Sequence, residues 1–499
     1  MDTKPTGPTT ARRRCGTLFA ALLLPALLGS CKTLWQPEPS AAATLGELPG
    51  RWTAPGSVPR PAATGWLDDF GSPALRELVE EAVGRNYNLA SSRTRIAQAL
   101  ERARLARADM LPTLDSSMST SRSQNLRGAA FLKTRANTYN LGLDFAWEAD
   151  IWGRLKNLRD AELDRIDAET ALYESARLSL AANVVKAALA AIEARGQIAI
   201  SRRTLSSLQT NLKILDSRLE AGDLAERAAL EISLSRADIA RAERAILISQ
   251  RRLDGARRTL ETLLGRYPSG EIDTLAQLPR LVREVPAGLP SDLLLRRPDI
   301  LAAEARVDAA TRELLASRKA LLPALRLSGS GGTASTRDIS DILNIQNLVW
   351  NIGQNLTQPL FRGGRLLAQI RLDEAGREEL VYFYAETALE AFREVETALA
   401  AESFLKAEVA ALTTASTESR RAEELGLGEF EQGLVEIITL LESQRRAFEA
   451  ESVLLDARLE LLTNRIDLHL ALGGDFDHLP PLAASEPAPV PEASAAPSP

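Results

Sequence analysis

Two stretches of the chain alternate between apolar and polar residues with a period of two. In the first, every second position is apolar, at Tyr139, Leu141, Leu143, Phe145 and Trp147. The second stretch has the same pattern, and its apolar positions are Leu348, Trp350, Ile352 and Leu356. Successive side chains of a strand point to opposite faces, so each stretch predicts a strand with one apolar and one polar face.

A weaker alternating run precedes each of these strands. The runs cover residues 113–121 and 324–330, and each directly follows a Leu-Pro pair. We interpret them as partner strands, which gives one β-hairpin in each half of the chain. The polar loops of these hairpins are expected near 122–137 and 333–346.

The remaining pattern predicts helices. Residues 113–267 and 360–479 contain no proline, and helices can therefore be very long there. Helices of roughly 70 residues are expected from Gly153 to Gly222 and from Gly364 to Gly433, each about 100 Å long. Shorter helices are expected before the hairpins, near 73–110 and 297–321, and returning helices of about forty residues are expected to end at Leu264 and Leu472.

Parts of these helices have the three-and-four spacing of heptads, with small residues at many seam positions. On the helices alone, an ordinary coiled coil is the favoured interpretation. The spacing is readable in the first returning helix at Ile232, Ser235, Ile239, Ala242, Ile246, Ser249, Leu253, Ala256, Leu260 and Leu263.

The two halves repeat each other at a distance of 211 residues. A shift of that size superimposes four landmarks, which is not expected by chance. They are Leu89 on Ile300, Leu111-Pro112 on Leu322-Pro323, Gly153-Arg154 on Gly364-Arg365, and Gly222 on Gly433. The chain therefore predicts two tandem copies of one unit, helix–hairpin–long helical hairpin.

The N-terminus has the features of an exported lipoprotein. Arg12–Arg14 precede an apolar run over 18–28, which ends in Leu28-Gly29-Ser30-Cys31. This predicts a signal peptide over 1–30 and a covalent lipid on Cys31. A plain secretory signal with an incidental cysteine is the alternative. Lys32 follows the cysteine, which in bacterial lipoproteins favours sorting to the outer membrane.

Composition excludes several classes of site. The net charge is −6 with 25% charged residues, which argues against a nucleic-acid partner. The only histidines, His469 and His478, lack cysteine or carboxylate neighbours at ligand spacing, so no metal site is expected. No nucleophile–base pair or phosphate loop stands out, so neither an enzyme nor a cofactor is expected, apart from the lipid on Cys31. We expect no apolar run of eighteen residues after Cys31, and hence no membrane-spanning helix.

Four amphipathic strands do not close a transmembrane barrel, because small barrels begin at about eight strands. Lipid does not tolerate the open edges of a sheet. Three chains would supply twelve strands, with the polar faces lining a lumen. This reasoning favours a homotrimer and leaves other multiples open.

Several motifs together resemble the TolC-like outer-membrane efflux proteins, in particular their NodT-type lipoprotein branch. The resemblance covers about residues 31 to 475. The matching segments are Trp66-Leu67-Asp68-Asp69-Phe70, Trp147 to Arg154, Leu289 to Ile300 with Arg296-Arg297-Pro298-Asp299, and Gln358 to Arg365.

The resemblance implies a mainly α fold with a β-barrel contribution. A trimer would form a 12-stranded outer-membrane barrel on a periplasmic α-helical tunnel. It would act as a passive duct that receives substrate from an inner-membrane pump of the resistance-nodulation-division type, through a periplasmic adaptor. The implied organisation is a lipid-anchored segment over 31–65, efflux repeats over 66–265 and 291–475, a connector over 266–290, and a disordered tail over 476–499.

Glycines mark the expected hinges and tips. Gly153 and Gly364 would be hinges between strand and helix, and Gly222 and Gly433 would mark the periplasmic tips, where an adaptor would dock. In the family the closure lies near the second tip. The gate candidates there, for each of which a solvated helix end is the alternative, are Leu425, Glu429, Phe430, Glu431 and Glu436.

Two other functions compete with a duct: a periplasmic coiled-coil adaptor without a pore, and an envelope enzyme. The hairpins argue against an adaptor, and the lack of a site argues against an enzyme. The Arg296-Arg297-Pro298-Asp299 motif is expected to be structural, with the proline in the first turn of a helix and the aspartate at its positive end. Drugs, siderophores, metals and lipids all remain open as cargo.

Overall fold

The computed structural model describes residues 41–46, 48–54, 65–127, 132–220, 228–273, 277–281, 288 and 290–474. The chain divides into two compact units, and both take residues from both copies of the repeat. One comprises Met1–Gly46, Arg95–Thr170 and Ala302–Glu386, and the other Glu47–Thr94, Ala171–Leu301 and Thr387–Pro499. The two copies therefore fold together and do not form separate domains. Cys31 and the expected signal peptide lie outside the described residues.

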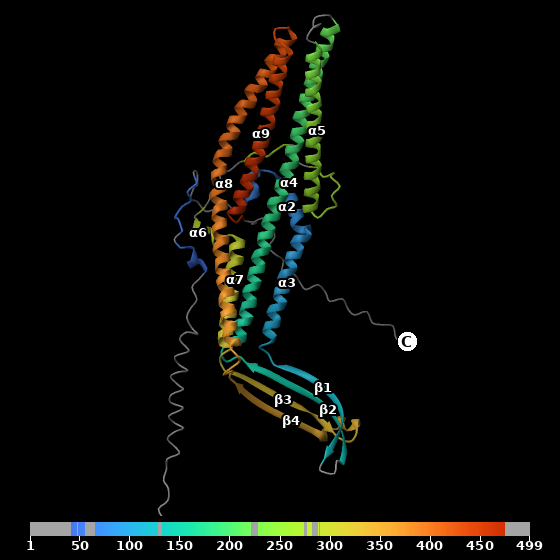
Figure 1. Ribbon diagram of the computed structural model, residues 1–499, viewed down its shortest axis with the longest axis vertical. Helices are drawn as coiled ribbons and strands as arrows, with labels where there is room; N and C mark the ends of the chain where they lie inside the picture. The colour runs from blue at the N-terminus through green and yellow to red at the C-terminus, as the bar shows by residue number, and fades with distance from the viewer. Residues whose placement is uncertain are drawn as a thin grey trace, which may run out of the picture. The chain divides into compact units, whose positions relative to one another are not determined.

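The main elements follow the same order in both copies: a helix of 22 residues, a β-hairpin, a long helix and a returning helix (Figure 1). In the first copy the elements are η2 (Trp66–Phe70), α2 (Pro73–Arg85), α3 (Tyr87–Ala108), β1 (Thr113–Arg127), β2 (Leu132–Ala149), α4 (Arg154–Glu220) and α5 (Ala228–Leu263). In the second they are α6 (Pro290–Leu293), α7 (Pro298–Lys319), β3 (Ala324–Ser335), η3 (Ile339–Leu343), η4 (Ile345–Asn347), β4 (Leu348–Thr357), α8 (Arg365–Glu431) and α9 (Ile437–Ala471). A short turn of helix, η1 (Ala41–Leu45), precedes both copies.

The long helices match the lengths expected from the sequence. Helices α4 and α8 each contain 67 residues, which corresponds to about 100 Å. The returning helices α5 and α9 contain 36 and 35 residues. The predicted pairing of a long helix with a returning helix in each copy is confirmed.

The helix expected over 73–110 is two helices, and that prediction was wrong in this detail. Asn86 interrupts it with an extended backbone, at φ −68° and ψ 123°. Its side-chain Oδ1 accepts hydrogen bonds from the backbone N–H groups of Asn88 (2.9 Å) and Leu89 (3.0 Å), which caps the start of α3. Its Nδ2 donates to the carbonyl oxygen of Leu263 at 2.9 Å, so the break also joins α2 and α3 to the end of α5.

The two hairpins form one antiparallel sheet in the order β1-β2-β3-β4, because β2 of the first copy pairs with β3 of the second. Figure 1 shows the four strands side by side. The strands are longer than expected. The sequence predicts a loop near 122–137, yet residues 122–127 and 132–137 continue the β1–β2 ladder, with Arg122 opposite Asn137 and Arg127 opposite Leu132.

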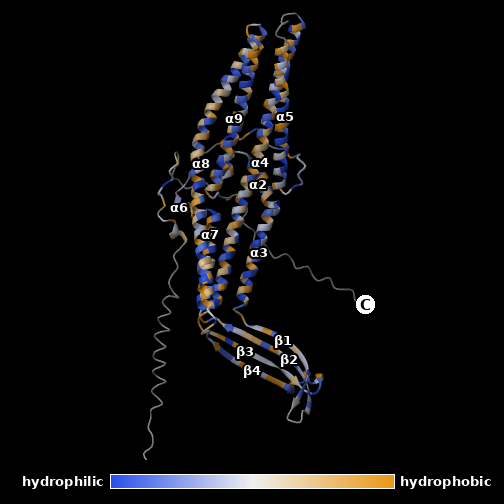
Figure 2. Cartoon of the chain, in the orientation of Figure 1, coloured by the Kyte–Doolittle hydropathy of each residue, from blue (hydrophilic) through white to orange (hydrophobic). Residues whose placement is uncertain are grey.

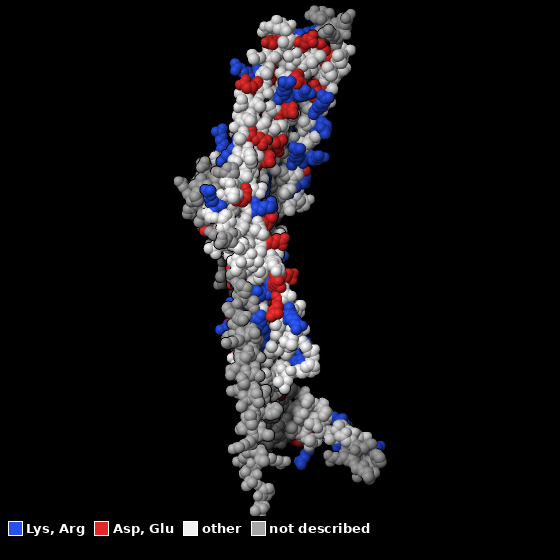
Figure 3. All heavy atoms as spheres, turned by 60° about the vertical axis from the view of Figure 1, so that its left-hand side comes forward, with Lys and Arg blue, Asp and Glu red and all other residues white. Residues whose placement is uncertain are grey.

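One described helix, α4, contains an 18-residue window apolar enough to cross a membrane by composition, with a mean hydropathy of 1.3. The expectation that no such stretch follows Cys31 was therefore wrong. The window is 67% buried within the chain, which is typical of a core helix. Helix α4 itself supplies many of the buried apolar residues of the chain, including Ala181, Val184 and Leu189. On the face seen in Figure 3, acidic and basic side chains are interspersed over the helices.

Candidate channel-forming surfaces

The register of the sheet brings the apolar faces of all four strands to one side. Directly opposed residues in neighbouring strands share a face, and the hydropathy of the strands alternates accordingly (Figure 2). The large apolar side chains on one face are Leu114, Met118, Leu141, Leu143, Phe145, Trp147, Leu325, Leu327, Leu348, Trp350, Ile352 and Leu356. The other face carries Asp115, Ser117, Ser119, Asn140, Asp144, Glu148, Arg326, Ser328, Ser330, Asn351 and Asn355. The predicted two-faced strands thus form a two-faced sheet.

Several large side chains of the apolar face are exposed in the part of the chain that the structure describes. The exposed fractions are 81% for Ile352, 72% for Trp350 and 68% for Leu114. An exposed apolar surface of this extent indicates contact with lipid or with another chain.

Glycines in β3 allow the strands and bulky side chains to approach each other. Gly331 lies opposite Leu143 and Trp350 on the apolar face. On the polar face, a Cβ atom at Gly332 would lie 2.2 Å from the carbonyl oxygen of Leu141. Only glycine fits at position 332 without displacing the backbone of β2.

The first strand-to-helix junction is organised by Asp150 and Gly153. Gly153 has a φ of +72°, in the left-handed region that favours glycine. The carboxylate of Asp150 accepts hydrogen bonds from the backbone N–H groups of Leu155 (3.1 Å) and Lys156 (2.7 Å), and these bonds cap α4. The Nζ of Lys319 donates to the carbonyl oxygen of Gly153 at 3.2 Å, which attaches the junction to the end of α7.

The second junction also turns at glycine, but with two adjacent residues of positive φ instead of one. Gly363 and Gly364 have φ values of +60° and +80° directly before α8. Both junctions expose apolar side chains. Leu360 and Phe361 are 90% and 88% exposed, and Trp152 in the first junction is 44% exposed.

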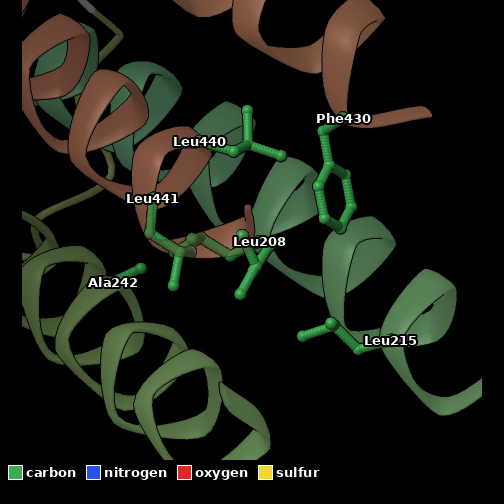
Figure 4. Close-up of a cluster of buried hydrophobic side chains, with 7 residues drawn as sticks. Leu208, Leu215, Ala242, Phe430, Leu440 and Leu441 are labelled. Carbon is green, nitrogen blue, oxygen red and sulfur yellow. The ribbon is translucent and has the colours of Figure 1, made fainter. Parts of the chain in front are cut away.

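The second tip is a turn at Gly433, which has a φ of +74°. Phe430, one of the gate candidates, is only 1% exposed and lies in a core between the two helical hairpins (Figure 4). The core contains Leu208, Leu215, Ala242, Phe430, Ile437, Leu440 and Leu441. A side chain buried within its own chain cannot narrow a lumen, so the structure argues against Phe430 as a gate and assigns it a packing role.

The other four gate candidates lie on the surface near this turn. Leu425 is 60% exposed, and Glu429, Glu431 and Glu436 are exposed as well. They are available to face a lumen or a partner. Gly222, the expected marker of the first tip, lies outside the described residues.

The outer membrane efflux protein family model matches residues 78–266 and 289–474. These two segments correspond to the two copies of the repeat and cover most of the chain. The chain belongs to the outer membrane efflux protein family.

Curated relatives of this efflux protein match it over most of their length. Outer membrane protein OprJ of Pseudomonas aeruginosa is 32% identical over 466 residues, which cover 92% of this chain and 96% of the relative. Cation efflux system protein CusC of Escherichia coli is 30% identical over 421 residues, which cover 82% and 88%.

Solved structures share the fold. The outer-membrane channel OprN matches with a TM-score of 0.80 at 25% identity, over 89% of this chain and 99% of that one. The open state of the Neisseria gonorrhoeae MtrE outer membrane channel matches with a TM-score of 0.79 at 28% identity, over 88% and 97%. This efflux protein is accordingly an outer-membrane channel protein, and the pore-less adaptor alternative is set aside.

Sequence reasoning missed a buried polar network in the efflux protein. Asp69, in the first of the family-like motifs, accepts a hydrogen bond from Arg465 (3.4 Å) and lies 2.8 Å from the Nε2 of His469. Arg465 is 1% exposed and also pairs with Glu402. Burial raises the pKa of Glu402, but hydrogen bonds and charge from Arg465 and Lys406 outweigh it and hold that pKa below its usual value. The network joins η2 to α8 and α9, which explains why an acidic residue stands in this motif.

The Arg297-Pro298-Asp299 segment has the structural role expected for it. Pro298 is the first residue of α7. Arg297, 8% exposed, donates to both carboxylate oxygens of Asp299 (3.0 and 2.6 Å) and to Glu394 (2.5 Å). It also donates to the carbonyl oxygen of Ala471 at 3.2 Å, so one guanidinium connects α7, α8 and α9.

Among the residues that the structure describes, no group of three or more histidine, cysteine, aspartate or glutamate side chains could hold a metal ion. His469, one of the two histidines, is engaged with Asp69 instead.

Proposed function

We propose that three copies of this efflux protein assemble into a passive duct through the outer membrane. The observation that carries the proposal is the two-faced sheet, whose outermost strands β1 and β4 each have one edge that pairs with no other strand among the described residues. Such edges are costly in lipid. Pairing of β1 with β4 of the next chain removes them, and three chains give a closed barrel of twelve strands. The apolar face then meets lipid and the polar face lines the lumen.

We further propose that the duct works with a periplasmic adaptor and an inner-membrane pump, commonly of the resistance-nodulation-division type. The adaptor would dock at the tips, where Gly433 and its exposed neighbours Glu429 and Glu431 lie. Relatives named for cation efflux, pyoverdine export and toluene efflux are 28–30% identical to this chain. Since similar channels serve such different compounds, the pump, and not the channel, would choose the cargo.

A lipid on Cys31 would be a second membrane anchor beside the strands. The proposal is supported by the sequence Leu28-Gly29-Ser30-Cys31 after an apolar run. The closed barrel would bury more apolar surface than the acyl chains on Cys31, so the barrel would supply most of the attachment.

Cysteine cross-linking between the edge strands tests the trimer. One cysteine replaces Ser117 in β1, and a second replaces Asn351, Gly353 or Asn355 in β4, in separate double variants. Oxidation in membranes should give covalent dimers and trimers and nothing larger, because the ring closes at three. Single-cysteine variants are the controls, since one edge alone cannot extend a ladder.

Cross-linked species larger than trimers would show that the ring contains more than three chains. Monomers in every pair, together with no conductance of the purified protein in planar bilayers, would overturn the duct itself.

A further inference from the structure

Opposite charges separate onto the two faces of the β1–β2 hairpin. In antiparallel pairing, the register fixes which residues share a face. Among the charged residues of these strands whose side chains the structure describes, the cations on the apolar face are Arg122, Lys133 and Arg135. The carboxylates on the polar face are Asp115, Asp144 and Glu148. The cationic residues thus lie on the side that the proposed barrel turns toward lipid.

The three cations lie on a ribbon that continues past the four-stranded part of the sheet. The pairing of β2 with β3 starts at Tyr139, so the preceding residues of β2 pair with β1 alone. Arg122, Arg135 and Lys133 occupy three successive rows on one face, opposite Asn137, Gln124 and Leu126. Rows on the same face are about 7 Å apart, so the three charges extend over roughly 14 Å along the ribbon.

The height of the apolar band places this ribbon at the outer membrane surface. The band on β2 extends from Ala149 to Tyr139, ten steps that correspond to about 33 Å along the strand. At the tilt usual in barrels this spans about 25 Å, which equals the apolar band of outer-membrane barrels. Tyr139 stands at the end of the band, where aromatic residues meet the interface. The cationic rows follow directly, at the level of the outer headgroups.

The loop beside the ribbon is also suited to an interface. Thr333 donates to the carbonyl oxygen of Ile342, and Ser335 donates to Asp341 at 3.0 Å, so η3 lies against the end of β3 on the apolar-face side. The loop exposes three large apolar side chains, Ile339 (50%), Leu343 (82%) and Ile345 (78%).

The charges of this loop leave the patch positive. Arg337, Asp338 and Asp341 belong to the loop, so with the ribbon there are four cations and two carboxylates, a surplus of two positive charges.

We propose that Arg122, Lys133 and Arg135 bind the phosphorylated sugar headgroup of lipopolysaccharide in the outer leaflet. The inference rests on the proposed barrel, which sets the lipid-facing side. The two guanidiniums match phosphate oxygens with paired N–H donors, and the lysine adds a compact charge. The headgroup carries two phosphates on one disaccharide, and the three cations are spread over three rows of the ribbon, so different cations can contact different phosphates. The acyl chains would lie against the apolar face below Tyr139.

Lipid binding to the purified protein tests this site. The intact trimer in neutral detergent is titrated with bis-phosphorylated lipid A, dephosphorylated lipid A or phosphatidylglycerol, and bound lipid is counted by native mass spectrometry. The test variant carries Arg122→Gln, Lys133→Gln and Arg135→Gln. The control carries Arg236→Gln, Arg244→Gln and Arg251→Gln on exposed positions of α5, with the same change in charge.

The test variant should bind bis-phosphorylated lipid A at least about tenfold more weakly than the wild type, since each basic residue contributes to attraction by anionic lipid. The control should bind as the wild type does, and dephosphorylated lipid A should not distinguish the proteins. Equal binding by variant and wild type would overturn the inference, as would equally tight binding of phosphatidylglycerol.

Channel conductance of the same preparations separates this outcome from the proposed function. A variant that conducts normally and binds lipid A unchanged refutes the lipid site alone. A wild type that neither forms trimers nor conducts refutes the barrel, and the lipid site with it.

Discussion

The guanidinium of Arg218 lies over the ring of Phe430, with its Cζ 4.5 Å from the ring centroid, and Nη2 donates to the carbonyl oxygen of the same residue at 2.6 Å. One side chain at the end of α4 thereby holds the last turn of α8. Because α4 and α8 belong to different copies of the repeat, this contact fastens the first helical hairpin to the second next to the Gly433 turn.

Replacement of Arg218 by methionine should loosen this tip. It removes a charged hydrogen bond and a cation–π contact, together about 2 kcal/mol. We expect a larger spontaneous conductance of the closed channel in planar bilayers. Arg202→Met, at an exposed position of the same helix, is the control and should leave conductance unchanged. Equal conductance in both variants would show that the tip does not depend on Arg218.

Replacement by alanine should prevent assembly at one of two adjacent glycines of β3 and should be tolerated at the other. At Gly332 a Cβ would lie 2.2 Å from the carbonyl oxygen of Leu141, whereas at Gly331 the nearest atom, the Cβ of Trp350, is 4.0 Å away. Gly332→Ala should prevent the pairing of β2 with β3 and abolish heat-resistant trimers on gels. Gly331→Ala should assemble at wild-type levels. Normal trimers from Gly332→Ala would contradict this sheet register.

The polar face should give the channel a preference for cations. Asp115 and Asp144 are directly opposed in the ladder, and like charges in that position destabilise a sheet. In a trimer they would place six carboxylates at one level of the lumen. Asp144→Asn should lower the cation-to-anion permeability ratio, measured from reversal potentials in a salt gradient, while Ser119→Ala on the same face should not. An unchanged permeability ratio would show that Asp144 does not contribute to the ion selectivity of the channel.

The sequence predicted element types well where one periodicity dominates. The alternation from Tyr139 to Trp147 identified a strand and both of its faces. Residues 122–127 and 132–137 lack large apolar side chains at alternate positions, so the same criterion assigned them to a loop. Their strand structure comes from pairing with each other across the hairpin, which a pattern along one segment does not reveal.

The features that the sequence did not predict depend on contacts between segments far apart in the chain. Phe430 is apolar and its exposed neighbours Glu429 and Glu431 are charged, but its burial depends on the packing of α4, α5 and α9 around it. A single sequence does not show that these helices meet there. The pairing of Asp69 with Arg465 joins residues almost 400 positions apart. A single sequence shows that both are charged but not that they meet.

A buried carboxyl group should make stability depend on pH. Burial, reinforced by the neighbouring carboxyl group of Asp456, raises the pKa of Glu193 from 4.5 to about 7. A raised pKa means that the folded chain keeps a proton that the unfolded chain releases. This contribution to stability is complete below pH 4.5 and is lost as the pH rises through about 7.

Glu193→Gln should therefore flatten the dependence of Tm on pH between 4.5 and 7 and should raise Tm at pH 8, by an amount equivalent to a few kcal/mol. Glu449→Gln, at an exposed position of α9, is the control and should preserve the wild-type profile. A wild-type profile in Glu193→Gln would mean that the carboxyl group is ionised throughout this range.

The two cysteines should differ completely in acylation. Cys31 follows the expected cleavage position, whereas Cys15 lies within the expected signal peptide. Cys31→Ala should abolish incorporation of labelled palmitate, and Cys15→Ala should leave it intact. Because a barrel buries far more apolar surface than one lipid anchor, Cys31→Ala trimers should stay in the outer membrane fraction after a high-salt wash. Their release into the soluble fraction would show that the lipid is the main anchor and that the strands alone do not hold the channel in the bilayer.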